Sequence, residues 1–217
     1  MTDQPASVLS PKQLAIGAIA AAAATGTLAR LAPALGNGLD AGLAIGEVKE
    51  LLVQLYAYVG FPRSLNALTE LMKVVDERRS RGVADAPGQE PGAVPEGHAL
   101  LELGTTNQTL LSGAPVRGSL FDFAPAIDRF LKMHLFGDIF GRDNIDWQSR
   151  ELATVAALSA LPGVESQLLA HLRISMNVGL TAAQLSQFAA ELSARGEVDA
   201  ARRLASTLGQ FAPEPKR

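Results

Sequence analysis

Residues 143–192 carry the clearest helical pattern in this chain, and they constrain its fold more than any other segment. Apolar side chains recur there every three or four positions in three successive runs, which predicts three amphipathic helices. Gly163 separates the first two runs, and Gly179 follows the second, where a left-handed residue commonly ends a helix. Thr181 and Gln184 have the spacing of a capping box, which marks the start of a third helix. The segment is therefore expected to form a helical hairpin with a third helix attached.

The same pattern occurs a second time nearer the N-terminus, at one constant offset in residue number. This offset places Gly26 on Gly163 and Gly42 on Gly179, so the breaks between helices repeat. Apolar positions coincide as well, including Leu31 with Leu168, Leu35 with Leu172 and Val48 with Leu185. The pattern predicts two copies of one helical unit within a single all-α domain. We expect the first copy in residues 1–81, a linker and irregular segment in residues 82–117, and the second copy in residues 118–217.

The composition favours closely packed helices. Hydrophobic residues make up 47% of the 217 residues, whereas aromatic residues make up only 5%. The core must therefore consist mainly of Ala, Leu and Val. Residues 82–97 are rich in Pro, Gly and acidic residues, which is typical of a linker or a long surface loop. For residues 98–120 the pattern indicates at most a short helix over residues 98–104.

Charge and cysteine content exclude several classes of function. The net charge of −3 provides no basic surface for a nucleic-acid backbone, so we expect no nucleic-acid partner. The chain has no cysteine, which excludes disulfides, thiolate metal sites and thiol redox chemistry. No apolar run reaches the roughly 20 residues that span a bilayer, so no membrane partner is expected either. The apolar segment over residues 14–27 matches the second copy, which explains it as a buried helix and not as the core of a signal peptide, so we expect a cytoplasmic location.

Two groups of polar residues lie within otherwise apolar helical patterns. Glu47, Glu50, Gln54 and Tyr58 form a polar stripe on the helix expected over residues 44–59. Such a stripe is usually a solvated face, and the lining of a pocket is the less common alternative.

His134 falls on the apolar side of the helix that begins near residue 124, so the helical pattern predicts that its imidazole points inward. Asp138, four residues later, is placed to hydrogen-bond and orient the ring. A buried histidine satisfied by this aspartate and a catalytic histidine are both open interpretations.

Four segments together resemble the carboxymuconolactone decarboxylase family in its tandem two-repeat form. They are LLVQLYAYVGFPRSLNAL at residues 51–68, HLFGDIFGRDNID at residues 134–146, RELATVAALSAL at residues 150–161 and HLRISMNVGLTAAQL at residues 171–185. The resemblance implies the all-helical fold of the alkylhydroperoxidase accessory proteins. It also implies a homo-oligomer, since these proteins usually assemble into trimers or hexamers.

The resemblance also shows what this chain lacks. In the peroxidase branch a Cys-x-x-Cys pair precedes a histidine, and His171 matches that histidine. The two thiol positions are occupied by Val164 and Gln167, and in the first copy the histidine position is Ala34. Peroxide reduction through a disulfide therefore has no nucleophile here. Any single site should lie in the second copy.

The resemblance implies cofactor-independent decarboxylation, or related proton transfer, on a small carboxylated lactone or carbonyl compound. Such chemistry needs a general acid or base and a group that holds carboxylates. The candidate catalytic residues are His134 and His171, with Asp138 as the orienting residue. The candidate substrate-binding residues are Glu47, Tyr58, Arg150 and Arg173. No metal and no organic cofactor is implied, and the partner is a small molecule.

Other interpretations remain open at this point. His171 can be structural, with an interhelical hydrogen bond to a carbonyl or to Glu151, and both arginines can lie at the surface. The protein can be a non-catalytic oligomeric binding protein, or it can act on another small carbonyl compound. Convergence of His134, His171, Glu47 and Tyr58 on one pocket would favour an enzyme.

Overall fold

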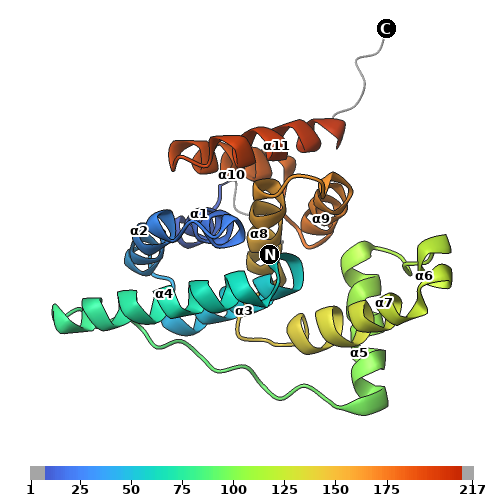
Figure 1. Ribbon diagram of the computed structural model, residues 1–217. Coiled ribbons are helices and arrows are strands. Elements are labelled where there is room, and N and C mark those ends of the chain that lie inside the picture. The colour runs from blue at the N-terminus through green and yellow to red at the C-terminus, as the bar shows by residue number, and fades with distance from the viewer. Residues whose placement is uncertain (1–7, 212–217) are drawn as a thin grey trace, which may run out of the picture.

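The computed structural model describes residues 8–211, and this part of the chain contains helices but no strand. Helix α8 (Trp147–Ala160) stands at the centre of the molecule, as Figure 1 shows. Helices of the N-terminal part pack on one side of it, and α9 (Glu165–Asn177) lies on the other. The all-α fold expected from the helical pattern is confirmed.

Four helices make up the N-terminal part. They are α1 (Pro11–Thr25), α2 (Leu28–Asp40), α3 (Ile45–Val59) and α4 (Phe61–Ser80). The Ser10 side chain caps α1 by accepting from the Gln13 N–H, and Pro11 occupies the first helical position, where a missing N–H does no harm. Gly26 then ends α1 in the left-handed conformation, with φ of 72°.

Four more helices follow the same order near the C-terminus. They are α8, α9, α10 (Ala182–Ala194) and α11 (Val198–Leu208), with a short 3₁₀ turn at Gly209–Phe211. Thr181 caps α10 through the capping box with Gln184 that its spacing predicts. Gly163 and Gly179 both have positive φ, as their positions at helix ends require.

The helix bounds of the two parts follow the offset that places Gly26 on Gly163. Helices α2 and α9 correspond at both ends, at residues 28–40 and 165–177. The starts of α3 and α10 correspond, at residues 45 and 182, and so do the starts of α4 and α11, at residues 61 and 198. Gly26 and Gly163 have φ of 72° and 80°. The two parts therefore share the same order of helices and the same turns.

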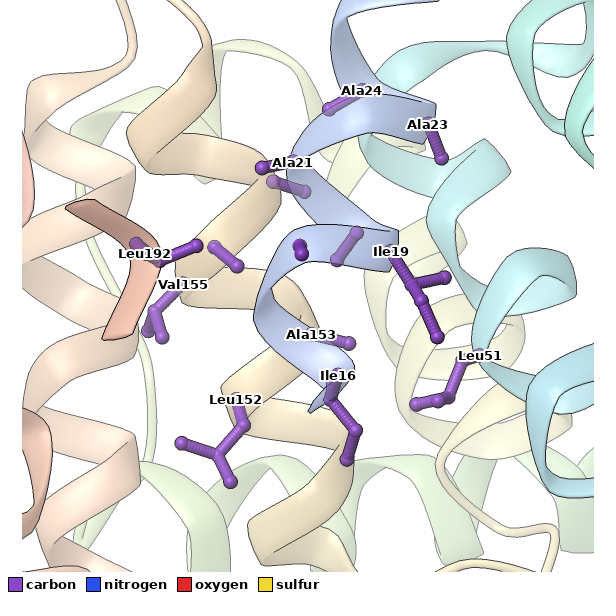
Figure 2. Close-up of a cluster of buried hydrophobic side chains, with 14 of the residues drawn as sticks. Ile16, Ile19, Ala21, Ala23, Ala24, Leu51, Leu152, Ala153, Val155 and Leu192 are labelled. Atoms are coloured by element: carbon purple, nitrogen blue, oxygen red, sulfur yellow. The ribbon is translucent and has the colours of Figure 1, made fainter. Parts of the chain in front are cut away.

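The main core forms where α1 crosses α8. Alanines fill this contact on both helices, including Ala20 to Ala24 on α1 and Ala153, Ala156 and Ala157 on α8. Figure 2 shows larger side chains around them, with Ile16 and Ile19 near Leu51 of α3 and with Val155 near Leu192 of α10. Such small side chains let the two helix backbones approach closely, which explains the alanine-rich composition.

A second, smaller lobe packs beside α3 and α9, at the lower right of Figure 1. It contains α5 (Gly97–Ser112), α6 (Ser119–Phe123), α7 (Pro125–Phe130) and the π-helix η1 (Leu131–Ile139). Its apolar cluster includes Leu111, Leu135 and Phe136, and Ile174 of α9 packs into the same cluster. Gly104 allows α5 to lie against η1, because a Cβ at that position would collide with the carbonyl of Lys132.

The segment between the two halves is more ordered than its composition predicts. Residues 82–117 include α5, which is 16 residues long and extends well beyond the short helix expected over residues 98–104. The irregular part is held to the helices, because the Ile45 N–H donates to the Ala86 carbonyl and the Gly92 N–H donates to Asp143. Asp85 accepts two hydrogen bonds from Arg78. Within the described residues, none of the helices has the length and hydropathy needed to cross a membrane.

Candidate active site

A buried carboxylate and imidazole meet between α8 and α9. His171 Nδ1 lies 2.9 Å from Glu151 Oε2, and the two side chains are 10% and 0% exposed. The turn at Gly163 folds α9 back against α8, and this packing places His171 beside Glu151. The contact is also the interhelical hydrogen bond that a structural role for His171 predicts. A histidine held in this way has a fixed orientation and a fixed tautomer.

Tyr58 of α3 completes the wall around this imidazole. Its ring meets the His171 ring edge-on, with 5.4 Å between centroids and 81° between planes. The Tyr58 hydroxyl is buried and makes no hydrogen bond of good geometry with any described residue. Burial raises the pKa of Tyr58, the nearby Glu151 carboxylate raises it further, and the Thr154 hydroxyl acts in the opposite direction. Tyr58 therefore remains a neutral hydrogen-bond donor at physiological pH.

The polar stripe on α3 is not a solvated face, which corrects the ordinary interpretation of its pattern. Glu50 and Gln54 are buried against α8, and Tyr58 continues the same face toward α9. Gln54 Nε2 donates to the Arg150 carbonyl at 2.9 Å and to the Thr154 hydroxyl at 2.8 Å. The face is polar because it carries the hydrogen bonds that join the N-terminal helices to α8.

Arg150 lies inside this polar contact, so the alternative that places it at the surface is wrong. Its side chain is fully buried and donates to Glu50 at 2.9 Å, to Gln54 at 3.0 Å and to the Arg142 carbonyl. Burial by itself raises the pKa of Glu50, but Arg142 and Arg150 hold it below its ordinary value. The guanidinium already donates to groups within the protein and is completely buried. Arg150 is therefore not placed to bind a substrate carboxylate.

His134 lies outside this site and faces solvent, which corrects the inward direction predicted for it. Its side chain is 46% exposed, and its ring lies beside Tyr56 rather than Tyr58. The hydrogen bond to Asp138 is present, with Nδ1 and Oδ2 2.7 Å apart. The direction differs because residues 131–139 form a π-helix, whose wider turn rotates each side chain away from its α-helical position.

The remaining candidates also lie elsewhere. Glu47 pairs with Lys12 at 2.9 Å and accepts from the Ala44 N–H at the start of α3. Arg173 is exposed and packs over the ring of Phe211. A groove of about 650 Å³ between α10 and α11 is lined by small and apolar residues and lies apart from His171. Among residues 8–211, no three His, Asp or Glu side chains gather in a way that could hold a metal ion.

Of the residues expected to converge, the structure brings only Tyr58 and His171 into contact. The sequence pattern did not identify Glu151 as a candidate site residue. It indicated Glu151 only as a possible hydrogen-bond partner of a structural His171. Its signal was present in the hairpin, because a carboxylate on one helix and a histidine on the next can face each other across a tight turn. Glu151, His171 and Tyr58 form the candidate active site.

The candidate active site lies within the part of the chain that resembles known proteins. The model of the carboxymuconolactone decarboxylase family matches residues 2–72 and residues 125–208. These segments contain all three residues of the candidate site and leave out α5. A comparison with curated proteins found no match. The chain belongs to the carboxymuconolactone decarboxylase family.

Proposed function

We propose that this protein is a cofactor-independent enzyme that moves a proton at His171 during decarboxylation, or a related reaction, of a small carboxylated lactone or carbonyl compound. The observation that carries the proposal is the buried contact of 2.9 Å between His171 and Glu151. Family membership supports the class of chemistry, and the contact supports the residues.

Loss of carbon dioxide leaves a carbanion or dienolate, which must receive a proton. An imidazole suits this step because it exchanges protons near neutral pH. With its Nδ1–H donated to Glu151, His171 presents Nε2 as the atom that exchanges a proton with the substrate. Glu151 is then a positioning residue that fixes the ring and stabilises the imidazolium.

We further propose that the chain contains a duplicated unit with one site. The matching helix bounds and the paired glycines support the duplication, with halves at residues 1–81 and 118–217 joined by residues 82–117. At the offset that pairs Gly26 with Gly163, His171 corresponds to Ala34 and Glu151 corresponds to Leu14. The first half therefore has neither group of the dyad, and it contributes Tyr58 to the site of the second half.

A homo-oligomer, a trimer or a hexamer, is part of the same proposal. Large apolar side chains are exposed on α4, α6 and α7, among them Phe61, Leu65, Phe123 and Phe130. Exposed apolar surface of this kind marks contact with other chains. Light scattering at micromolar concentration tests the assembly, and a stable monomer would contradict it.

The second candidate function is a non-catalytic binding protein on the same fold. The observation that favours it is the same dyad, because a buried histidine bonded to a glutamate also stabilises a helix pair without any chemistry. Thiol peroxidase activity is not a candidate, since the chain has no cysteine.

The test compares three single changes in an assay of carbon dioxide release from carboxylated lactones and β-keto acids. His171→Gln should lower turnover by about 10²–10⁴-fold, the usual effect of losing a general acid or base. His98→Gln is the control, because His98 is exposed and pairs with Glu102 one turn away, outside the candidate active site. His134→Gln tests the other candidate histidine. It should leave turnover unchanged, because His134 lies outside the candidate active site.

Full activity of His171→Gln with an unchanged circular dichroism spectrum would remove the proposed role of His171. Should His171→Gln unfold while the parent protein consumes no compound of either class, the histidine is structural. The binding-protein function would then replace the enzyme.

A further inference from the structure

Two buried polar atoms beside His171 have no hydrogen-bond partner among the described residues. They are the Tyr58 hydroxyl oxygen and Glu151 Oε1, the carboxylate oxygen that does not contact the imidazole. Glu151 is completely buried, so solvent does not satisfy this oxygen from outside. Buried polar atoms in folded proteins are nearly always hydrogen-bonded, and an exception calls for a ligand or a bound water.

The residues that carry these two atoms both contact the His171 ring. Glu151 reaches His171 through Oε2 at 2.9 Å, and the Tyr58 ring contacts the imidazole edge-on at 5.4 Å between centroids. The Thr154 hydroxyl lies near Tyr58 but makes no hydrogen bond of good geometry with it, and instead donates to the Arg150 carbonyl and accepts from Gln54. Both free atoms are therefore available to a group that lies next to His171.

Their hydrogen-bonding roles are complementary. A neutral tyrosine hydroxyl is a donor, and a carboxylate oxygen is an acceptor. A single O–H group can accept from the first and donate to the second, whereas a carbonyl, an ether or an alkyl group cannot do both. Burial of Tyr58 raises its pKa and keeps the donor protonated.

We propose that the Tyr58 hydroxyl and Glu151 Oε1 together bind one hydroxyl group beside His171. In the free protein this group is a water molecule. In the complex it is a hydroxyl or enol oxygen of the substrate, and this second part rests on the proposed function. The substrate class is then narrowed from carboxylated lactones and carbonyl compounds in general to those that carry a hydroxyl, or form an enol, next to the reacting carbon.

Tyr58 is then a substrate-binding residue whose hydroxyl donates a hydrogen bond to the substrate oxygen. Loss of carbon dioxide places negative charge on the reacting carbon and on the substrate oxygen conjugated with it, and proton delivery from His171 to carbon removes this charge. A neutral donor held in a buried site stabilises such charge more strongly than it would in water. The arrangement assigns proton exchange to the imidazole and oxygen binding to the phenol.

The first test measures binding without turnover. The probes are α-hydroxy-γ-butyrolactone and γ-butyrolactone, a matched pair that differs by one hydroxyl group, titrated into the protein and followed by NMR. The hydroxylated lactone should bind about tenfold more tightly than the other, the gain expected of a satisfied buried pair. Tyr58→Phe should abolish this difference.

Tyr56→Phe is the control for this change. Tyr56 is the other tyrosine of the chain, lies two residues away on α3 and stacks on Phe61 with 4.4 Å between centroids. The variant should keep the tenfold preference. Circular dichroism spectra should show that both variants are folded.

The second test is a high-resolution crystal structure of the free protein. A water molecule should lie within hydrogen-bond distance of both atoms, and in Tyr58→Phe this water should be displaced while the contact between Glu151 and His171 remains. An empty position in the parent protein would overturn the first part of the proposal. Equal binding of the two lactones to the parent would overturn the part that concerns substrate.

Failure of this inference and failure of the proposed function are distinguishable. If the lactone preference depends on Tyr58 but no carboxylated compound is consumed, the hydroxyl position stands and the enzymatic function fails. If His171→Gln abolishes turnover while Tyr58→Phe changes neither binding nor turnover, the function stands and the hydroxyl position is wrong.

Discussion

Arg150 and Glu50 form an ion pair of 2.9 Å in which the side chains are 0% and 2% exposed. The pair joins α8 to α3, and Gln54 extends the contact by bonding both the guanidinium and the main chain of Arg150. Tyr58 lies one turn beyond Gln54 on the same face. The ion pair therefore fixes the register between the helix that carries Glu151 and the helix that carries Tyr58.

Removing one partner of this pair should destabilise the protein strongly. Glu50→Ala leaves the Arg150 charge buried without its carboxylate, and broken buried pairs of this kind cost about 3–5 kcal/mol. Urea unfolding measures the change. Glu90→Ala is the control, because Glu90 forms an exposed pair with Lys49, and its loss should cost less than about 1 kcal/mol.

The double variant Glu50→Leu with Arg150→Met should recover part of the lost stability, because apolar side chains avoid the burial of an uncompensated charge. A double variant less stable than Glu50→Ala would show that packing around Phe140, over which Arg150 lies, outweighs the charge.

The sequence predicted the helix ends well because the signals that set them are local. Gly26 and Gly163 occupy left-handed conformations that only glycine adopts easily, and Thr181 caps the helix that follows it. These features depend on a few neighbouring residues and need no tertiary contact. The same reasoning explains why the offset between the two glycines recovers the bounds of α2 and α9.

Alanine at Gly26 or at Gly163 should destabilise the protein by similar amounts. An added Cβ meets no atom within 4 Å at either position, so the effect is confined to the positive φ and amounts to about 1–2 kcal/mol. Gly36→Ala is the control. Gly36 lies within α2 and is equally open, so alanine there should stabilise the helix by about 0.5–1 kcal/mol. Thermal unfolding measures all three, and a neutral change at Gly26 alone would argue that the two turns are not equivalent.

Side-chain direction was less predictable than the helix ends. The α-helical period predicts an inward direction for His134, but residues 131–139 form a π-helix, which no local pattern in the sequence indicates. The hydrogen-bond partners of Arg150 cannot be predicted from local sequence patterns for another reason. Glu50 lies 100 residues away in sequence, so its contact with Arg150 depends on the packing of α3 against α8.

Glu197 should make stability depend on pH in the direction opposite to an ordinary ion-paired carboxylate. Burial raises the pKa of Glu197, and Arg30 at 3.3 Å lowers it by less. The folded protein therefore holds this proton to a higher pH than the unfolded chain does, so the favourable contribution is present at low pH and is lost as pH rises.

Glu197→Gln should consequently raise the melting temperature at pH 7, and this gain should vanish below about pH 4, where glutamate is protonated in both states. Glu77→Gln is the control, because Glu77 is exposed on α4. It should leave the melting temperature unchanged both at pH 7 and below about pH 4. A gain that increases toward acidic pH would show that Glu197 is stabilised as the carboxylate instead.

The last prediction concerns the carboxylate that positions His171. Glu151→Gln keeps the size of the side chain but replaces the carboxylate that contacts His171 with a neutral amide. If the proposed reaction occurs, kcat should fall by roughly 10²-fold with little change in KM, because a neutral amide can still accept from the ring but no longer stabilises the charge that develops during proton transfer. Steady-state kinetics measure both constants. Glu102→Gln, at an exposed glutamate on α5, is the control and should leave kcat unchanged. A folded Glu151→Gln protein with the kcat of the parent would show that the glutamate supports only the packing of α8 against α9.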